Sequence, residues 1–137
     1  MAGYGEGGLE KHVVALANGL MRHKNGIQVS VIADPMYGAR FAQGVTFMPF
    51  AFSSNRRNPI ALFRLWRTIR RTRPDIVHAH GNKAASMVGR LLPLLKVRSV
   101  ATLHSRKKNV RMFHAFERVI AVSQVSTENL AHPAIRI

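Results

Sequence analysis

The sequence predicts an α/β fold, in which a parallel sheet carries helices on both faces. Short strand-like runs alternate with longer helix-like segments along the 137 residues. These runs are mainly apolar rather than strictly alternating between apolar and polar residues, as is typical of strands buried on both faces. Apolar residues make up 47% of the chain, which is enough for a buried core. The length fits one domain, and we expect residues 1–137 to form it.

The first half of the chain contains two predicted helices and two predicted strands. Leu9, Val13, Leu16 and Leu20 recur at helical spacing and predict the first helix, which Asn25-Gly26 is suited to end. The strands are predicted at 27–33 and 45–48, and the second helix at 59–72 because Pro59 suits a first turn and Pro74 stops the far end.

The second half continues the same alternation. Strands are predicted at 76–79, 97–103 and 119–122, and helical segments at 82–92, 110–116 and 123–131. With this alternation, the strands should lie parallel and be joined by helical crossovers.

The residues that directly follow the predicted strands are the candidates for chemistry. In open parallel α/β sheets, ligands bind at the carboxyl ends of the strands. Two of these ends carry histidine and two carry lysine, a combination suited to acid–base work and anion binding. The candidates are Asp34, His80, Gly81, Asn82, Lys83, His104, Ser105, Arg106, Lys107, Lys108 and Ser123.

Gly7 and Gly8 stand directly before the first predicted helix. Unpaired amides and the positive end of the helix dipole can bind a phosphate there, and glycine lets a ligand approach the backbone. A simple entry turn explains the pair equally well. The pair is not part of a P-loop, because no Gly-Lys-Ser/Thr follows, and no strand precedes it as in a dinucleotide-binding motif.

His78 and His80 lie two residues apart in a predicted strand and should point to the same side. No third ligand stands at a spacing typical of a metal site. The chain also has no cysteine. We therefore expect no metal and no cofactor, with one histidine structural and the other lining the site.

A formal net charge of +15 favours polyanionic partners. Nucleic acid is disfavoured among them, because no helix-turn-helix pattern or set of zinc ligands is present. The arginine-rich helix at 59–72 fits either a solvated basic face or contact with an anionic membrane. A non-catalytic basic module that binds anionic membrane or nucleic acid is the alternative to an enzyme. The absence of a signal peptide, an apolar span and cysteine predicts a cytoplasmic protein, with a peripheral position on the inner membrane face as a further expectation.

Four segments, in order, resemble the N-terminal domain of family-four GT-B glycosyltransferases. The glycine pair and the helix after it resemble the first loop and helix of that family. The segment 73–81 resembles its acidic-strand-histidine segment, and 101–104 resembles the strand that delivers a histidine to the cleft. The segment 119–123 resembles the last strand before the crossover between domains.

The resemblance implies a fold of two Rossmann-like domains that face each other across a cleft, with the acceptor held by the N-terminal one. It also implies metal-free transfer from a nucleotide sugar with retention at the anomeric carbon. The amides of Gly7 and Gly8 would contact the donor diphosphate, and His104 would contact the donor sugar. Most nucleotide-sugar contacts, including a paired-glutamate motif, would lie in a C-terminal domain.

The chain departs from the family pattern at both ends. The family's first strand should precede the glycine loop, and its second domain should follow residue 137. We therefore expect a domain that is incomplete at both ends and inactive alone. The basic loop of Arg106, Lys107 and Lys108, together with His80, Asn82 and Lys83, would bind a saccharide or lipid-linked acceptor in envelope glycan synthesis of the lipopolysaccharide type. A solvated loop is the other interpretation of this segment.

Overall fold

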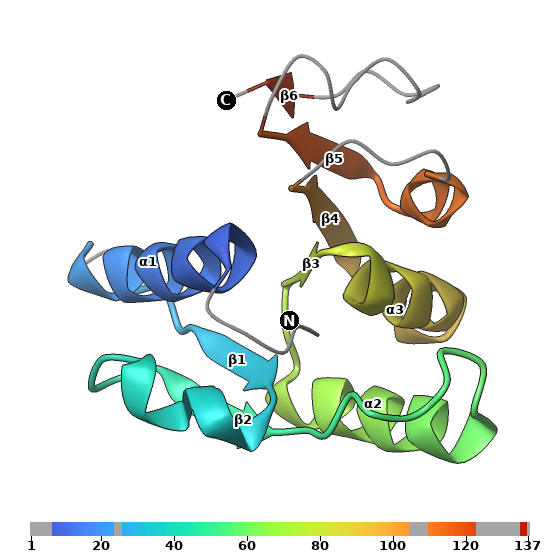
Figure 1. Ribbon diagram of the computed structural model, residues 1–137, viewed down its shortest axis with the longest axis horizontal. Coiled ribbons are helices and arrows are strands. Elements are labelled where there is room, and N and C mark those ends of the chain that lie inside the picture. The colour runs from blue at the N-terminus through green and yellow to red at the C-terminus, as the bar shows by residue number, and fades with distance from the viewer. Residues whose placement is uncertain (1–6, 24–25, 105–109, 123–134, 137) are drawn as a thin grey trace. The chain divides into compact units, whose positions relative to one another are not determined.

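The computed structural model describes residues 7–23, 26–104, 110–122 and 135–136, in two compact units (Figure 1). The first unit covers residues 1–54 and the second covers 55–137. All of the strand pairs are parallel, as the sequence predicts. Within the described ranges, no helix is both long and apolar enough to span a bilayer.

The first unit packs one α-helix against a two-stranded sheet. Its elements are α1 (Gly8–Arg22), β1 (Ser30–Ala33), the 3-10 helix η1 (Pro35–Arg40) and β2 (Thr46–Pro49). Their core contains Val13 and Ala17 of α1, Val31 and Ala33 of β1, and Tyr37 of η1. Asn18 of α1 holds the chain after η1, since its side chain donates to the Arg40 carbonyl at 3.2 Å and accepts from the Ala42 amide at 2.8 Å.

The second unit contains a four-stranded sheet. Its elements are α2 (Pro59–Thr72), β3 (Ile76–His80), α3 (Asn82–Leu95), β4 (Arg98–Leu103), the 3-10 helix η2 (Arg111–Ala115), β5 (Arg118–Ala121) and β6 (Ile135–Arg136). The strand order is β3-β4-β5-β6 (Figure 1). α3 packs against β3 and β4, and it also contacts α2 and η2.

Several predicted boundaries were wrong. β1 starts at Ser30 rather than at residue 27, and α1 ends at Arg22, before the expected Asn25-Gly26 cap. Its C-cap, His23, is extended, and Gly26 has a φ of 69°. η1 was not predicted as helical because it is a short turn. The Asp34 carboxylate, a candidate for chemistry, instead accepts from the Met36 amide at 3.3 Å and caps that turn.

The third helix is longer than predicted. α3 continues through Pro93 and ends at Leu95, whereas the predicted end was residue 92. Proline lacks an amide hydrogen but tolerates helical φ, so the last turn survives the loss of one bond. Lys96 closes the helix in a left-handed conformation and donates its amide to the Leu92 carbonyl at 3.0 Å. β6 was not predicted, and the predicted helix at 123–131 lies outside the described residues.

The second helix has the bounds that its two prolines predict, Pro59–Thr72. The cap was not part of that prediction. The Asn58 side chain accepts hydrogen bonds from the amides of Ile60 and Ala61 at 3.0 and 3.1 Å, as an N-cap residue does. The buried side, Ala61, Leu65 and Ile69, faces the core.

We expect Asn58→Ala to lower the free energy of unfolding by about 1 kcal/mol, because two amides of the first turn lose their acceptor. Urea denaturation followed by circular dichroism measures this change. Asn58→Asp is the matched variant, since it keeps the acceptor oxygen and should restore most of the loss. Equal stability of Asn58→Ala and the original protein would show that the cap does not stabilise α2.

Candidate functional site

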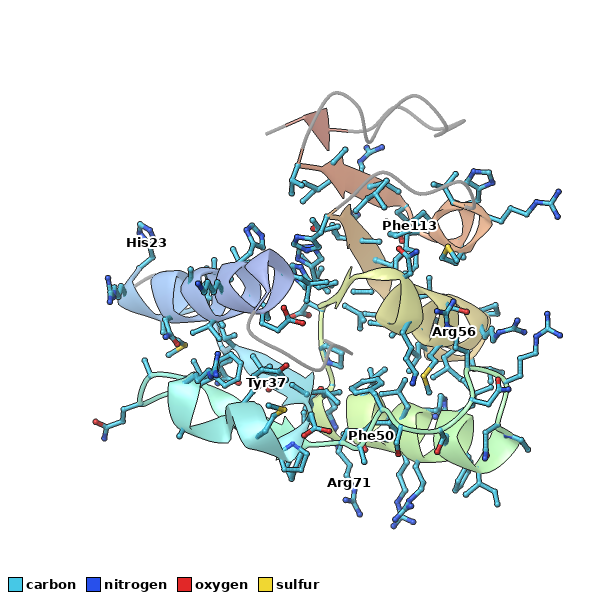
Figure 2. The ribbon with its side chains drawn as sticks, viewed as in Figure 1. His23, Tyr37, Phe50, Arg56, Arg71 and Phe113 are labelled. Atoms are coloured by element: carbon cyan, nitrogen blue, oxygen red, sulfur yellow. The ribbon has the colours of Figure 1, made fainter. Side chains whose placement is uncertain are left out.

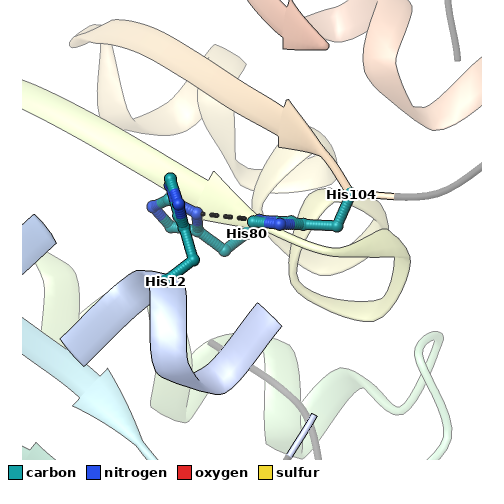
Figure 3. A group of neighbouring side chains, drawn as sticks. All are labelled: His12, His80 and His104. Atoms are coloured by element: carbon teal, nitrogen blue, oxygen red, sulfur yellow. Dashed lines mark hydrogen bonds between the residues drawn. The ribbon is translucent and has the colours of Figure 1, made fainter. Parts of the chain in front are cut away.

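Two histidines meet at the carboxyl ends of β3 and β4. His80 is the last residue of β3, and His104 directly follows β4. The register pairs Ala79 with Ala101 and His80 with Thr102, so the two strands end side by side. The Nδ1 atom of His80 and the Nε2 atom of His104 are 3.2 Å apart, within hydrogen-bond distance (Figure 3). Both residues belong to the second unit, so the pair is a local feature of this sheet.

The hydrogen bond between the two rings constrains their protonation. One of the two nitrogens must carry a hydrogen and the other must not, because a hydrogen bond needs one donor and one acceptor. Whichever direction the bond takes, it fixes the tautomer of both neutral rings. His80 is buried, with 5% of its surface exposed, whereas His104 is half-buried. His104 is therefore the more accessible partner, and the buried His80 ring holds it by this hydrogen bond.

A third histidine continues the row along β3. The ring centroids of His78 and His80 are 4.0 Å apart, which confirms that the two side chains point to the same side of the strand. The Nε2 atom of His78 lies 2.7 Å from the hydroxyl of Thr102 on β4. Sequence reasoning missed Thr102, which is 1% exposed, because its role depends on the register between two strands. This contact holds His78 in place and fits the structural role expected for one histidine of the pair.

One glycine turns the chain from β3 into α3 at this edge. Gly81 has φ 80° and ψ 163°, a conformation that is essentially restricted to glycine. Its amide donates to the Thr102 carbonyl at 3.3 Å, and its carbonyl accepts from the Ala85 amide at 3.0 Å. The helix therefore begins directly after His80, and its first residues, Asn82 and Lys83, follow at the same edge. Both side chains are half-buried.

The N-terminus of α3 carries no acidic residue in its first turn. Its free amides and the positive end of its dipole favour an anion, and the ammonium group of Lys83 adds a full positive charge. The predicted acceptor residues His80, Asn82 and Lys83 are thus brought together. The other three, Arg106, Lys107 and Lys108, lie outside the described residues.

The predicted diphosphate-binding glycines lie in the first unit, at the start of α1. Gly7 is the N-cap and Gly8 the first helical residue, and both are exposed. A Cβ atom at Gly8 would have no neighbour within 4 Å in the described part of the chain outside its own helix backbone, whereas one at Gly7 would lie 2.9 Å from Oε2 of Glu10. Gly8 therefore leaves open space above the first turn, into which a ligand could approach the backbone.

Glu10 is a residue that sequence reasoning missed. It lies in the first turn of α1 and is only 7% exposed, and its carboxylate comes close to the Gly7 backbone. Negative charge at a helix N-terminus is stabilising. An acidic residue three positions after the N-cap is a known capping pattern, so the spacing from Gly7 to Glu10 could have indicated it. Any anion that binds at Gly7 must coexist with this carboxylate.

The comparisons with known proteins agree with this architecture. The family model described as Glycosyltransferase Family 4 matches residues 6–136. A crystal structure of MurG from Acinetobacter baumannii is similar in fold, with a TM-score of 0.68 and 19% sequence identity over 99% of this chain. The chain spans 42% of the length of that MurG chain. No curated protein matches this chain in sequence. The likeness confirms the predicted fold, one Rossmann-like half of a GT-B architecture.

Proposed function

Since the chain belongs to glycosyltransferase family 4, we propose that it forms the acceptor-side half of an enzyme that transfers a sugar from a nucleotide sugar. The acceptor in this proposal is a saccharide or lipid-linked saccharide of envelope glycan synthesis, of the lipopolysaccharide type. The observation that carries the proposal is the hydrogen-bonded pair of His80 and His104 at the carboxyl ends of two neighbouring parallel strands. This is where ligands bind in folds of this kind.

In the proposed reaction, the bond between the anomeric carbon and the diphosphate oxygen breaks. A new bond forms between that carbon and an acceptor oxygen, and the hydroxyl proton of the acceptor passes to an oxygen of the departing nucleotide diphosphate. His104 contacts the donor sugar near this carbon. Positive charge develops on the sugar, and negative charge develops on the leaving diphosphate. Fixed dipoles placed at those two positions lower the barrier, because they need no reorganisation during the reaction.

In this proposal, His80 does not contact the acceptor directly. It is buried, and its Nδ1 atom is engaged with His104. It therefore acts as a positioning residue that fixes the ring orientation and tautomer of His104. Asn82 and Lys83, at the open start of α3, are left as the groups that contact the acceptor. Lys107 and its basic neighbours at 106 and 108 remain a proposal for the same role.

The stereochemical outcome tests the class of transferase. We propose retention, so the sugar should have the same anomeric configuration in the product as in the donor. The full-length protein would be supplied with an α-linked nucleotide sugar, and the coupling constant of the anomeric proton in the purified product would be measured by NMR. An inverted product would contradict a retaining mechanism while leaving the family assignment intact.

Lys83→Gln should raise KM for a phosphorylated acceptor several-fold and leave KM for the donor unchanged. The reason is that an exposed or half-buried cation near an anion contributes about 1 kcal/mol or less, which is roughly a five-fold change in affinity. Lys96→Gln is the matched control, because Lys96 is an exposed lysine at the opposite end of the same helix. If Lys83→Gln and Lys96→Gln change acceptor KM equally, Lys83 does not contact the acceptor.

Gly8→Ala distinguishes an effect on the stability of the first unit from an effect on ligand binding at its first helix. Among the described residues, apart from its chain neighbours and the backbone of its own helix, the added methyl group meets no atom within 4 Å, and alanine favours the helix. We therefore expect stability to be unchanged or raised by about 0.5–1 kcal/mol. If the Gly8 amide binds the donor diphosphate, transfer should nevertheless fall at least ten-fold. Unchanged kcat/KM for the donor would show that the glycine serves only as an entry turn.

The peripheral membrane position is also part of the proposal. A lipid-linked acceptor is confined to the bilayer surface, so its enzyme must work there. On the cytoplasmic side, where nucleotide sugars are made, this surface is the inner face of the membrane. The net charge of +15 supports this position, because that leaflet carries anionic lipids.

A further inference from the structure

The nitrogens of His80 and His104 have the separation of two ligands of one metal ion. Zinc in proteins is bound by imidazole nitrogens at 2.0–2.1 Å in tetrahedral geometry, which places two such nitrogens about 3.3 Å apart. The Nδ1 atom of His80 and the Nε2 atom of His104 are 3.2 Å apart (Figure 3). A metal ion can therefore replace the shared hydrogen, once the His104 ring turns so that both lone pairs face the ion.

One of the two ligands is held in place and the other is accessible. His80 is 5% exposed, and its ring centroid lies 4.0 Å from that of His78, which is itself held by the Thr102 hydroxyl at 2.7 Å. An ordered side chain loses little conformational entropy when it binds a metal. His104 is half-buried and directly follows β4, so its ring gives an ion a route to the pair.

The surroundings of the pair determine which metal ions fit. The described part of the second unit has two acidic residues, Asp75 directly before β3 and Glu117 directly before β5. Both stand at the amino ends of parallel strands, whereas the histidine pair stands at the carboxyl ends. Magnesium and calcium prefer carboxylate and carbonyl oxygens, so the pair does not suit them. Imidazole nitrogens suit zinc, copper and nickel.

The charge of the chain strengthens this selection. A net charge of +15 repels every cation. Only a cation that forms strong bonds to nitrogen can overcome this repulsion, and Zn²⁺ is such a cation. Two protein nitrogens leave two tetrahedral positions for water. A site with so few protein ligands should bind Zn²⁺ reversibly, as an inhibitor rather than as a resident cofactor.

Sequence spacing could not indicate this site. The pattern searched for was His78 and His80 with a third ligand nearby, but His78 is engaged by Thr102. The second ligand comes instead from the neighbouring strand, because the register of β3 and β4 brings their carboxyl ends together. The expectation of no metal therefore rested on the wrong pair of histidines.

We propose that His80 and His104 together bind Zn²⁺, and that Zn²⁺ at this pair inhibits sugar transfer. On binding, the ring that carries the shared hydrogen changes to its other tautomer, so that both nitrogens offer a lone pair and both rings stay neutral. His104 is then no longer available to contact the donor sugar. Inhibition rests on the proposed function, whereas Zn²⁺ binding does not.

Isothermal titration calorimetry with zinc chloride tests the binding, using the full-length protein without a histidine tag and without donor or acceptor. The test variants are His104→Ala and His80→Ala. The matched control is His114→Ala, which removes an exposed histidine of η2 in the same unit. Magnesium chloride is the second probe. Circular dichroism confirms that each variant is folded, and His104→Ala decides the result if His80→Ala does not fold.

We expect each test variant to weaken Zn²⁺ binding at least about 10-fold, since even the outer-shell partners of metal ligands contribute that much. His114→Ala should bind Zn²⁺ within about two-fold of the original protein, and Mg²⁺ should not bind at the pair. The proposal is overturned if the original protein binds no Zn²⁺, or if His104→Ala binds it as tightly as His114→Ala does. Binding of Mg²⁺ that His104→Ala removes would overturn the selection for nitrogen-binding metals.

A transfer assay with and without zinc chloride tests the inhibition separately. Zn²⁺ should inhibit the original protein and His114→Ala alike, and a chelator should restore the activity of both. A protein that binds Zn²⁺ through the pair but transfers no sugar contradicts the proposed function and leaves the metal site intact. A protein that transfers sugar normally while Zn²⁺ occupies the pair contradicts the inhibition alone.

Discussion

Replacement of His104 by alanine is expected to lower kcat of sugar transfer by roughly 100- to 1,000-fold, the effect typical of removing one group that stabilises a transition state. His104 follows β4, is half-buried, and has its Nε2 atom 3.2 Å from Nδ1 of His80. The variant removes a ring from the edge of the sheet and leaves the strand itself intact. Its free energy of unfolding should therefore change by much less than its activity. Steady-state kinetics and thermal unfolding of the full-length protein measure the two quantities.

His114→Ala is the matched control, because His114 is an exposed histidine of η2 in the same unit. Its kcat should remain within about two-fold of the original. His80→Ala separates positioning from direct action. It removes the support of His104, so it should lower kcat with little change in KM, and His80→Asn should recover part of the activity because an amide can still hydrogen-bond the ring. Normal kcat in His104→Ala would exclude this histidine from the reaction.

The largest effect on stability is expected for Phe113→Ala. Phe113 is 0% exposed and lies in η2, which packs on α3 (Figure 2). The packing is close, because a Cβ atom on Gly89 of α3 would lie 3.2 Å from the Cβ atom of Ala115 and 3.4 Å from the Met112 carbonyl oxygen. Little room remains for the neighbours to collapse into the space vacated by the ring. Truncation of a buried phenylalanine costs about 3–5 kcal/mol in such surroundings.

Denaturation by guanidinium chloride measures this loss. Since small domains are stable by about 5–15 kcal/mol, Phe113→Ala should shift the midpoint strongly or leave the second unit partly unfolded at room temperature. Phe113→Leu keeps most of the apolar volume and should cost less than half as much. Met112→Ala is a further control in the same turn, because Met112 is only half-buried. A loss below about 1 kcal/mol for Phe113→Ala would show that η2 is not part of the core of this unit.

The sequence predicted the parallel strands and the main helices because apolar periodicity and proline are local signals. Pro59 and Pro74 bracket α2, and the apolar runs before His80 and His104 correspond to β3 and β4. The start of β1 and the end of α1 could not be predicted as well. Residues 27–29 are as apolar as a strand requires, but strand pairing in β1 begins only at Ser30, opposite Thr46. Pairing depends on a partner distant in sequence, which periodicity does not contain.

The candidate site was also predictable in part, because the residues that follow the predicted strands can be read from local signals. The rule that ligands bind at the carboxyl ends of parallel strands identified His80 and His104, and the structure brings these two residues together. The different roles of these two histidines could be assigned only from the burial of each ring and the distance between the rings. His80 is covered and His104 is accessible, although the two look alike in the sequence. Thr102 was missed because its role arises from strand register, whereas Glu10 could have been identified from its spacing to Gly7.

We propose that the chain takes part in sugar transfer from a nucleotide sugar to an acceptor of the envelope. The most direct measurement supplies the full-length protein with radiolabelled nucleotide sugars, one at a time, together with a lipid extract of bacterial envelopes. We expect at least one donor to label an acceptor in the extract, and His104→Ala to abolish most of this labelling. Labelling by no donor, in a parallel assay where an established family-four enzyme is active, would contradict the proposed function.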